Sequence, residues 1–221
     1  MKQTQYMMLA CTTLRQEITA VMEEEGLHYP VFYLPSELHL KPENLKNYLC
    51  DFIPRLVGVD YLLLPLGRCG NGTVGVPSGN TTLILPKSED CISLLLSTER
   101  LSDVQRDRYS VFYTESWLDY YNSITNEYDR MIAKRGKTRA DSLMKSLYKH
   151  YKQFIYLDSG YGDREAGLAK IKPLAEAADV ELATECVKFG VLRKMITLNF
   201  DDEDFLHVPP GGEVAFEQGT A

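Results

Sequence analysis

The chain has 221 residues, a formal net charge of −7, and hydrophobic and charged fractions of 44% and 25%, as expected of a folded globular protein. The acidic balance argues against nucleic acid as a partner, because phosphate recognition needs a basic face. No run approaches the roughly 18 apolar residues of a membrane span, and the N-terminus lacks the regions of a secretory signal. We therefore expect a cytoplasmic protein that binds neither nucleic acid nor a membrane.

Short apolar runs alternate with amphipathic stretches, a pattern typical of βαβ units around a mostly parallel sheet. In the first half it predicts strands near residues 6–10, 29–35, 60–67 and 81–86, with helices over 13–25, from 42 to about 54, and after 90. The first helix is expected to begin with a capping box of Thr13 and Gln16 and to end at Gly26.

In the second half the same pattern predicts strands near 110–114, 153–158, 180–185 and 204–211, with helices over 115–134, 138–151, 163–178 and 189–200. The predicted fold is α/β, with Rossmann-like, mostly parallel sheets and helices on both faces. We expect two halves, residues 1–110 and 111–221, that pack together, because no Pro/Gly/Ser-rich linker separates them.

Cysteine and histidine residues follow the predicted strands of the first half. Cys11, Cys69 and Cys91 come after the first, third and fourth strands, and His39 lies in the exit of the second. Ligands of open α/β sheets bind beyond the carboxyl ends of the strands, so these four side chains are expected to converge there. Cytoplasmic thiols stay reduced, which makes them metal ligands or nucleophiles; the alternative is three buried core thiols.

The spacing indicates what kind of metal site these residues could form. The cysteines are separated by 58 and 22 residues, which excludes the local knuckles of small zinc modules. Three thiolates could hold an iron–sulfur cluster with one iron open to a substrate or to His39, or zinc with His39 as fourth ligand. The identity of the ligands does not distinguish an iron–sulfur cluster from zinc. Helix starts near Cys11 and Cys91 are expected to stabilise their thiolates.

Three other ionisable residues are expected to lie outside this site. Cys50 falls on a predicted helix and is expected to be a small core residue. Cys186 follows a strand of the second half, but no capped or Gly-rich loop surrounds it. Glu17 is expected to form a solvated pair with Arg15, with acid–base catalysis as the alternative.

The loop LGRCGNGTVG, residues 66–75, has glycines at the G-x-G-x-x-G spacing of nucleotide sites. Such glycines must open a helix, but little room remains before the next predicted strand. A nucleotide-dependent enzyme therefore ranks last among the alternatives. We expect instead that Gly70, Asn71 and Gly72 let the backbone approach a metal centre.

Several segments together resemble the family catalogued as domain of unknown function 1638: LACTTLRQEI, LPSELHLKPENL, LGRCGNG, EDCISLLL and FLHVPPG. In that family the motif cysteines and histidine correspond to Cys11, Cys69, Cys91 and His39. The family is often linked to corrinoid-dependent methyl transfer from methylated amines, so the resemblance implies a corrinoid protein or a methyltransferase as partner. The layout is also similar to 2-hydroxyacyl-CoA dehydratase subunits, whose dispersed cysteines hold a four-iron cluster, but such an analogy does not transfer function.

These observations lead to one principal hypothesis and two alternatives. The first is a cytoplasmic protein with an iron–sulfur cluster or zinc held by three cysteines and His39, acting on a small molecule in one-carbon or methylamine metabolism. As an enzyme, it would polarise or reduce a small substrate at an open coordination position, or transfer a methyl group through an activated thiolate. The alternatives are a non-enzymatic accessory protein with a structural zinc site and the nucleotide-dependent enzyme.

Overall fold

The computed structural model describes residues 3–35, 37–38, 41–121 and 123–216. The chain divides into two compact units, one of Met1–Val104 with Lys188–Ala221 and one of Gln105–Val187. The first boundary lies near the expected residue 110. The second differs from the expected division, because the chain after Lys188 returns to the first unit instead of completing a second half.

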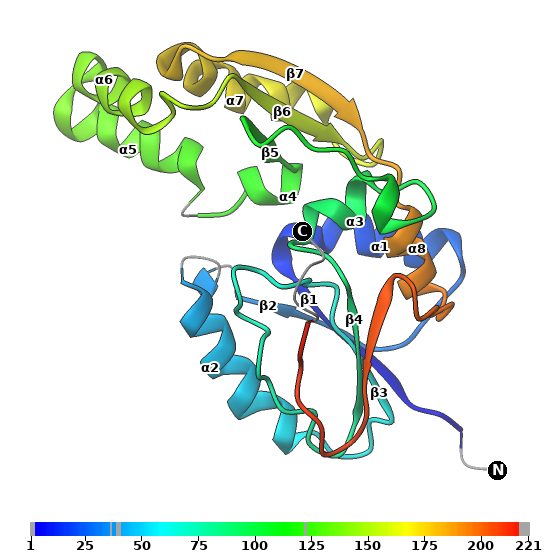
Figure 1. Cartoon of the computed structure of the whole chain (residues 1–221). Helices are drawn as coiled ribbons and strands as arrows, with labels where there is room; N and C mark the ends of the chain where they lie inside the picture. The colour runs from blue at the N-terminus through cyan, green and yellow to red at the C-terminus, as the bar shows by residue number, and fades with distance from the viewer. Residues whose placement is uncertain (1–2, 36, 39–40, 122, 217–221) are drawn as a thin grey trace. The chain divides into compact units, whose positions relative to one another are not determined.

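A five-stranded sheet forms the centre of the first unit, in the order β2-β1-β3-β4-β8 (Figure 1). Its strands are β1 (Tyr6–Cys11), β2 (Val31–Leu34), β3 (Tyr61–Leu63), β4 (Thr82–Pro86) and β8 (Phe205–Val208). β1 to β4 are mutually parallel, and β8 pairs with β4 in the antiparallel direction. The expected α/β class with a mostly parallel sheet is confirmed.

Helices cover both faces of this sheet. They are α1 (Arg15–Glu24), α2 (Pro42–Phe52), α3 (Ile92–Leu96) and α8 (Gly190–Ile196), with short 3-10 turns at Thr12–Leu14, Ile53–Arg55 and Leu101–Asp103. Figure 1 shows α2 on one face and α1, α3 and α8 on the other. The expected capping box is wrong, because α1 begins after Leu14 without a side-chain cap. Gly26, at φ +62°, ends α1 as expected.

The sheet residues that face α2 include the first cysteine of the candidate site. Met7, Leu9 and Cys11 alternate along β1 and belong to one buried cluster with Leu45 and Leu49 of α2. Side chains two residues apart point to the same face of a strand, so Cys11 continues this row at the carboxyl end of β1. Burying each leucine contributes roughly 1.5–3 kcal/mol, which fixes α2 against the strand that carries Cys11.

Close packing explains why the chain returns to the first unit after Lys188. A Cβ added at Gly190 would lie 1.7 Å from the Thr98 carbonyl oxygen, so α8 can begin there only with glycine. The buried Asp204 accepts from Lys194 Nζ at 3.0 Å and from the Leu101 N–H at 2.8 Å. These contacts position β8 beside β4. The alternation of strands and helices in the sequence does not indicate this strand order.

The second unit contains a parallel sheet in the order β5-β6-β7. Its elements are β5 (Ser110–Tyr113), α4 (Glu115–Leu118), α5 (Ile124–Arg135), α6 (Lys137–Leu147), β6 (Gln153–Asp158), α7 (Arg164–Ala178) and β7 (Glu181–Cys186). The helix predicted over 115–134 is two helices, because Ser123 caps a new start by accepting from the Asn126 N–H at 3.3 Å.

Among the described residues, no helix has both the length and the apolar character needed to span a bilayer.

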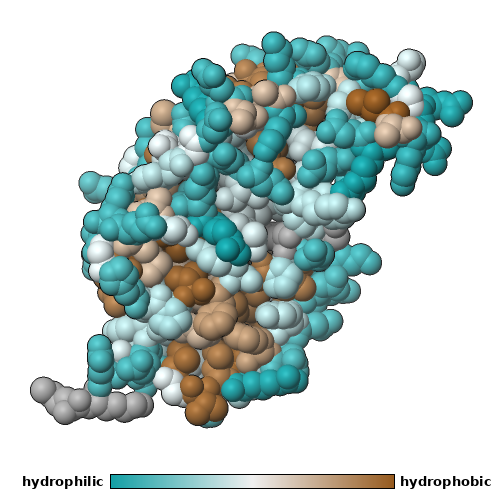
Figure 2. Space-filling model, turned by 180° about the vertical axis from the view of Figure 1, so that it is seen from behind, coloured by the Kyte–Doolittle hydropathy of each residue, from teal (hydrophilic) through white to brown (hydrophobic). Residues whose placement is uncertain are grey.

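Part of the surface is hydrophobic. Phe32, on the edge strand β2, is 53% exposed, and Val57 is 92% exposed. Figure 2 shows hydrophobic side chains gathered over one region of the face seen there, with hydrophilic side chains over most of the rest. Single exposed apolar residues such as Val57 are normal in folded proteins.

Candidate functional site

Three cysteines follow three neighbouring parallel strands. β1, β3 and β4 are adjacent in the sheet, so their carboxyl ends lie side by side at one edge. Cys11 ends β1, Cys69 lies in the loop after β3, and Cys91 lies after β4. Negative charge on Cys11 raises the pKa of both other thiols, and charge on Cys69 raises the pKa of Cys91. The three side chains are therefore close enough to interact electrostatically.

Cys11 is held by the turn that leads into α1. Its side chain is fully buried, and Sγ accepts from the Thr13 N–H at 3.2 Å. The Thr13 hydroxyl lies 2.7 Å from Sγ of Cys11 and also hydrogen-bonds the side chain of Cys91. Burial raises the pKa of Cys11 to about 11, although both Thr13 hydrogen bonds lower it. The Thr13 side chain thus links two of the three thiols, a role that the sequence did not reveal.

Cys69 sits in a strained backbone conformation. Its φ is +47°, in the left-handed region that costs a non-glycine residue roughly 1–2 kcal/mol. The Cys69 N–H donates to the Glu89 carbonyl at 2.8 Å, and the Arg68 N–H donates to the Ser88 carbonyl at 2.7 Å. Sγ of Cys69 donates to the Leu66 carbonyl. Strain of this kind persists where the surroundings enforce it, often at functional sites.

The glycines of the loop serve its packing against α2. A Cβ at Gly70 would lie 3.0 Å from Cγ of Pro42, and one at Gly72 would lie 3.0 Å from Cδ2 of Leu45. A backbone approach of Gly70, Asn71 and Gly72 to a bound group stays a prediction. Residues 64–81 contain no helix, so the loop lacks the structure that a nucleotide fingerprint requires.

Cys91 stands directly before α3. The neighbouring Asp90 accepts through Oδ1 from the Ile92 and Ser93 N–H groups, at 3.1 and 3.3 Å, as the side chain of an N-cap residue does. Burial raises the pKa of Cys91 well above its ordinary value, and the charges of Cys11, Cys69 and Asp90 raise it further. The short helix does not offset these effects.

The expectation of stabilised thiolates is therefore wrong. Burial is the largest cause of a raised pKa at Cys11, Cys69 and Cys91 alike. A buried anion loses its hydration, and at these positions that cost exceeds the stabilisation available from helix ends and hydrogen bonds. At neutral pH the metal-free protein holds three neutral thiols.

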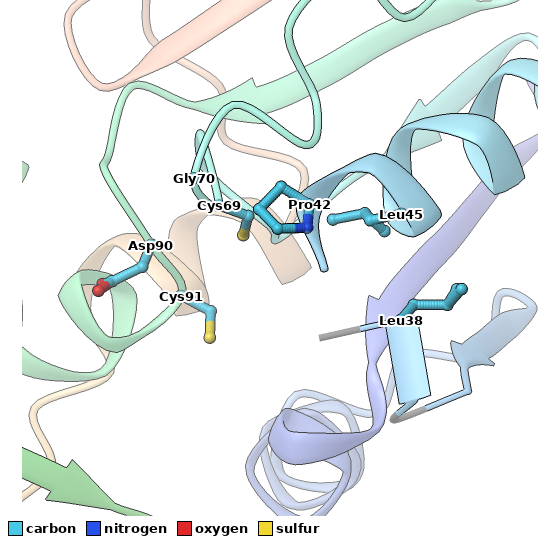
Figure 3. Close-up of a pocket in the computed structure, with 7 residues that line it drawn as sticks. All are labelled: Leu38, Pro42, Leu45, Cys69, Gly70, Asp90 and Cys91. Carbon is cyan, nitrogen blue, oxygen red and sulfur yellow. The ribbon is translucent and has the colours of Figure 1, made fainter. Parts of the chain in front are cut away.

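A cavity of about 310 Å³ opens beside two of the thiols. It is lined by Leu38, Pro42, Leu45, Cys69, Gly70, Asp90 and Cys91. Figure 3 shows the sulfur atoms of Cys69 and Cys91 on one side, with the α2 residues and Leu38 across from them. Within the described residues, no group of three or more Cys, His, Asp or Glu side chains is placed to hold a metal ion as it stands.

A buried carboxylate near the site contradicts the prediction for Glu17. Its side chain is fully buried in the first turn of α1 and is not the solvated partner of Arg15. Its charge raises the pKa of Cys11. The sequence did contain a signal, because Leu14, Ile18 and Val21 define the buried helix face on which Glu17 also falls.

The remaining candidates divide as follows. His39 lies outside the described residues, so its place at the strand edge stays a prediction. Cys50 is partly buried and packs against the core beneath α2, as expected of a core thiol. Cys186 is exposed at the end of β7 in the second unit. Cys11, Cys69 and Cys91 are therefore the cysteines that share one edge.

Comparison with known proteins places most of the chain in one family. Residues 33–196 match the model of a family described as "Protein of unknown function (DUF1638)". The matched span includes two of the three site cysteines. No curated protein and no solved structure matches the chain.

Proposed function

The chain belongs to the family described as Protein of unknown function (DUF1638), and we propose that it binds a metal centre through the thiolates of Cys11, Cys69 and Cys91. One observation carries this proposal: three adjacent parallel strands deliver three interacting thiols to one edge, beside a cavity. Core cysteines serve packing alone and have no reason to follow every strand of a neighbouring trio.

A cation at this edge would offset the cost of ionising the three thiols. Each thiol is disfavoured as an anion by burial and by its neighbours. A bound metal ion reverses these causes, because a coordinating thiol is deprotonated outright. The strained backbone of Cys69 is consistent with a side chain held in place for binding rather than for stability.

Of the two candidate groups, we favour an iron–sulfur cluster over zinc. One zinc ion holds its sulfur ligands at about 2.3 Å, so the three cysteines would have to close in to bind it. A cluster distributes its cysteine ligands over several iron atoms and suits more widely placed sulfurs. An iron atom without a protein ligand would supply an open position for a small substrate.

The cavity favours an enzyme over an accessory protein. A structural zinc site is closed by four ligands and needs no adjoining space, whereas a catalytic site keeps a position open. The accessory protein with structural zinc, completed by His39, is the second proposal. A corrinoid protein or methyltransferase partner, methyl transfer, and a cytoplasmic location stay predictions from the sequence.

Anaerobic reconstitution separates these proposals. The metal-free protein is incubated with iron and sulfide, or with zinc, and then freed of unbound metal. Broad absorbance at about 400 nm, with acid-labile sulfide, is expected for an iron–sulfur cluster. Stoichiometric zinc with no colour would favour the accessory protein, and retention of neither would remove the metal proposal.

A further inference from the structure

We propose that the cavity beside Cys69 and Cys91 binds a small, uncharged organic molecule with a hydrocarbon part and disfavours anions. The inference deepens the proposed function, since it names the class of molecule that would meet the metal centre. It depends, however, on the walls of the cavity, which can be tested without metal.

The shape and lining of the cavity set the size and polarity of this molecule. Leu38, Pro42 and Leu45 present a hydrocarbon wall opposite the two sulfur atoms (Figure 3). A volume of about 310 Å³ is at the low end of the range for small-molecule sites, so the ligand is small. Its hydrocarbon part would lie on the leucine and proline wall, and its reactive end would face the thiols.

The charges at the cavity disfavour an anion. Asp90 is the charged residue of the described lining, and its negative charge opposes negative charge on Cys69 and on Cys91. The described lining contains no lysine or arginine. Arg68, next to Cys69 in the chain, pairs with Glu89 instead. Thiolates formed on metal binding would add further negative charge.

A cation is also disfavoured, for a different reason. Figure 3 shows the Asp90 carboxylate directed away from the leucine and proline wall. One of its oxygens accepts from the first N–H groups of α3, so it is engaged in capping that helix. An ammonium group in the cavity would give up its hydration against hydrocarbon, which is costly without a close partner. An uncharged molecule avoids both penalties.

Thiol-modifying reagents that share an ethyl methanethiosulfonate core test this directly on the metal-free protein. The 2-hydroxyethyl, 2-aminoethyl and 2-sulfonatoethyl methanethiosulfonates are neutral, cationic and anionic. In each case the cysteine thiolate attacks the sulfenyl sulfur, a mixed disulfide forms, methanesulfinate leaves, and the thiol proton goes to solvent. Peptide mass spectrometry gives the rate at each cysteine. The exposed Cys186 serves as the reference in the same molecule.

Relative to Cys186, the neutral reagent should modify Cys69 or Cys91 about tenfold faster than the anionic one, and also faster than the cationic one. Because every reagent needs the same thiolate, the raised pKa values cancel from these ratios. Neutral-to-anionic and neutral-to-cationic rate ratios equal to those at Cys186 would overturn the proposal. So would modification of Cys186 with no reaction at Cys69 and Cys91 during an incubation long enough to offset their smaller thiolate fraction, because the cavity would then admit none of these molecules.

Two variants locate the source of the discrimination. Asp90→Asn keeps the helix cap, since Asn caps as well as Asp, and should lower the neutral-to-anionic ratio severalfold toward that at Cys186. Glu89→Gln removes an exposed neighbouring carboxylate outside the lining and should leave the ratio unchanged. An unchanged ratio in Asp90→Asn would overturn the charge argument. Selectivity in a protein that takes up no metal would remove the proposed function and leave this inference intact.

Discussion

The backbone N–H of Cys69 donates to the carbonyl oxygen of Glu89 at 2.8 Å, and this bond ties the loop after β3 to the loop after β4. It brings Cys69 near Cys91, while the pairing of β1 with β3 brings Cys11 to the same edge. The site therefore depends on the folded sheet and not on a local motif. Metal that binds there should stabilise the folded chain, because the unfolded chain has no assembled site.

Metal binding should release protons. Burial raises the pKa of Cys11 to about 11 and raises those of Cys69 and Cys91 as well, so the metal-free protein carries protonated thiols at neutral pH. Zinc affinity should then rise with pH, by up to about tenfold per pH unit for each thiol that ionises. Competition with a chromophoric chelator at several pH values measures this. An affinity that does not change with pH would contradict thiol ligation.

The metal-free protein should lose stability at alkaline pH. Folding raises the pKa of Cys11 from 9.0 to about 11, so above pH 9.0 the unfolded chain binds fewer protons than the folded chain. Stability therefore falls through this window, by up to about 1.4 kcal/mol per pH unit from this thiol. Buried tyrosines such as Tyr113 add to the decline. The contribution of Cys11 is therefore the difference between the urea unfolding free energies of the unchanged protein and of Cys11→Ser, measured across this pH range. The variant should show a shallower decline, whereas Cys186→Ser should follow the unchanged protein.

Glycine and alanine should have opposite effects at two of the cysteines. At Cys69, with φ +47°, the Gly variant should be about 1 kcal/mol more stable than the Ala variant, because only glycine adopts this region freely. At Cys91, with φ −72° and ψ −18°, the Ala variant should be the more stable by roughly 0.5–1 kcal/mol. Urea unfolding of the four metal-free variants measures both differences. The same sign at both positions would contradict a strained Cys69.

Gly67 should be essential to the position of the loop. A Cβ at this residue would lie 2.6 Å from Oγ and 2.7 Å from the carbonyl oxygen of Ser88, and φ is +65°. Gly67→Ala should therefore cost about 3 kcal/mol or more in unfolding free energy and should weaken metal binding. Gly58→Ala is the matched control, since φ is +77° but nothing lies within 4 Å, and should cost about 1 kcal/mol. Equal costs would show that the loop can shift.

Much of the fold could be predicted from the sequence, because the period of apolar residues identifies each element. The strand at Gln153–Asp158 was predicted with its observed bounds, and the helix after it within one residue. The return of β8 to the first sheet could not be predicted. It depends on contacts such as that between Gly190 and Thr98, which join residues far apart in the chain.

The site was predicted in part. The rule that strand exits meet at one edge identified Cys11, Cys69 and Cys91, but the order that makes their strands neighbours came from the structure. The predicted protonation states of the three thiols were wrong, because the spacing of residues in the sequence does not reveal how deeply a side chain is buried. Glu17 was missed although the helical spacing of its apolar neighbours placed it on the buried face. The contact of Thr13 with two thiols had no sequence signal.

The metal and sulfide content of anaerobically reconstituted protein tests the central claim most directly. The unchanged chain, single Ser variants at Cys11, Cys69 and Cys91, and a Cys50→Ser, Cys186→Ser double variant are compared under identical conditions. We expect the unchanged chain and the double variant to bind the same stoichiometric amount, and each single variant to lose most of it. An unchanged chain that binds none, or single variants that bind as much as the double variant, would contradict a centre held by these three thiolates.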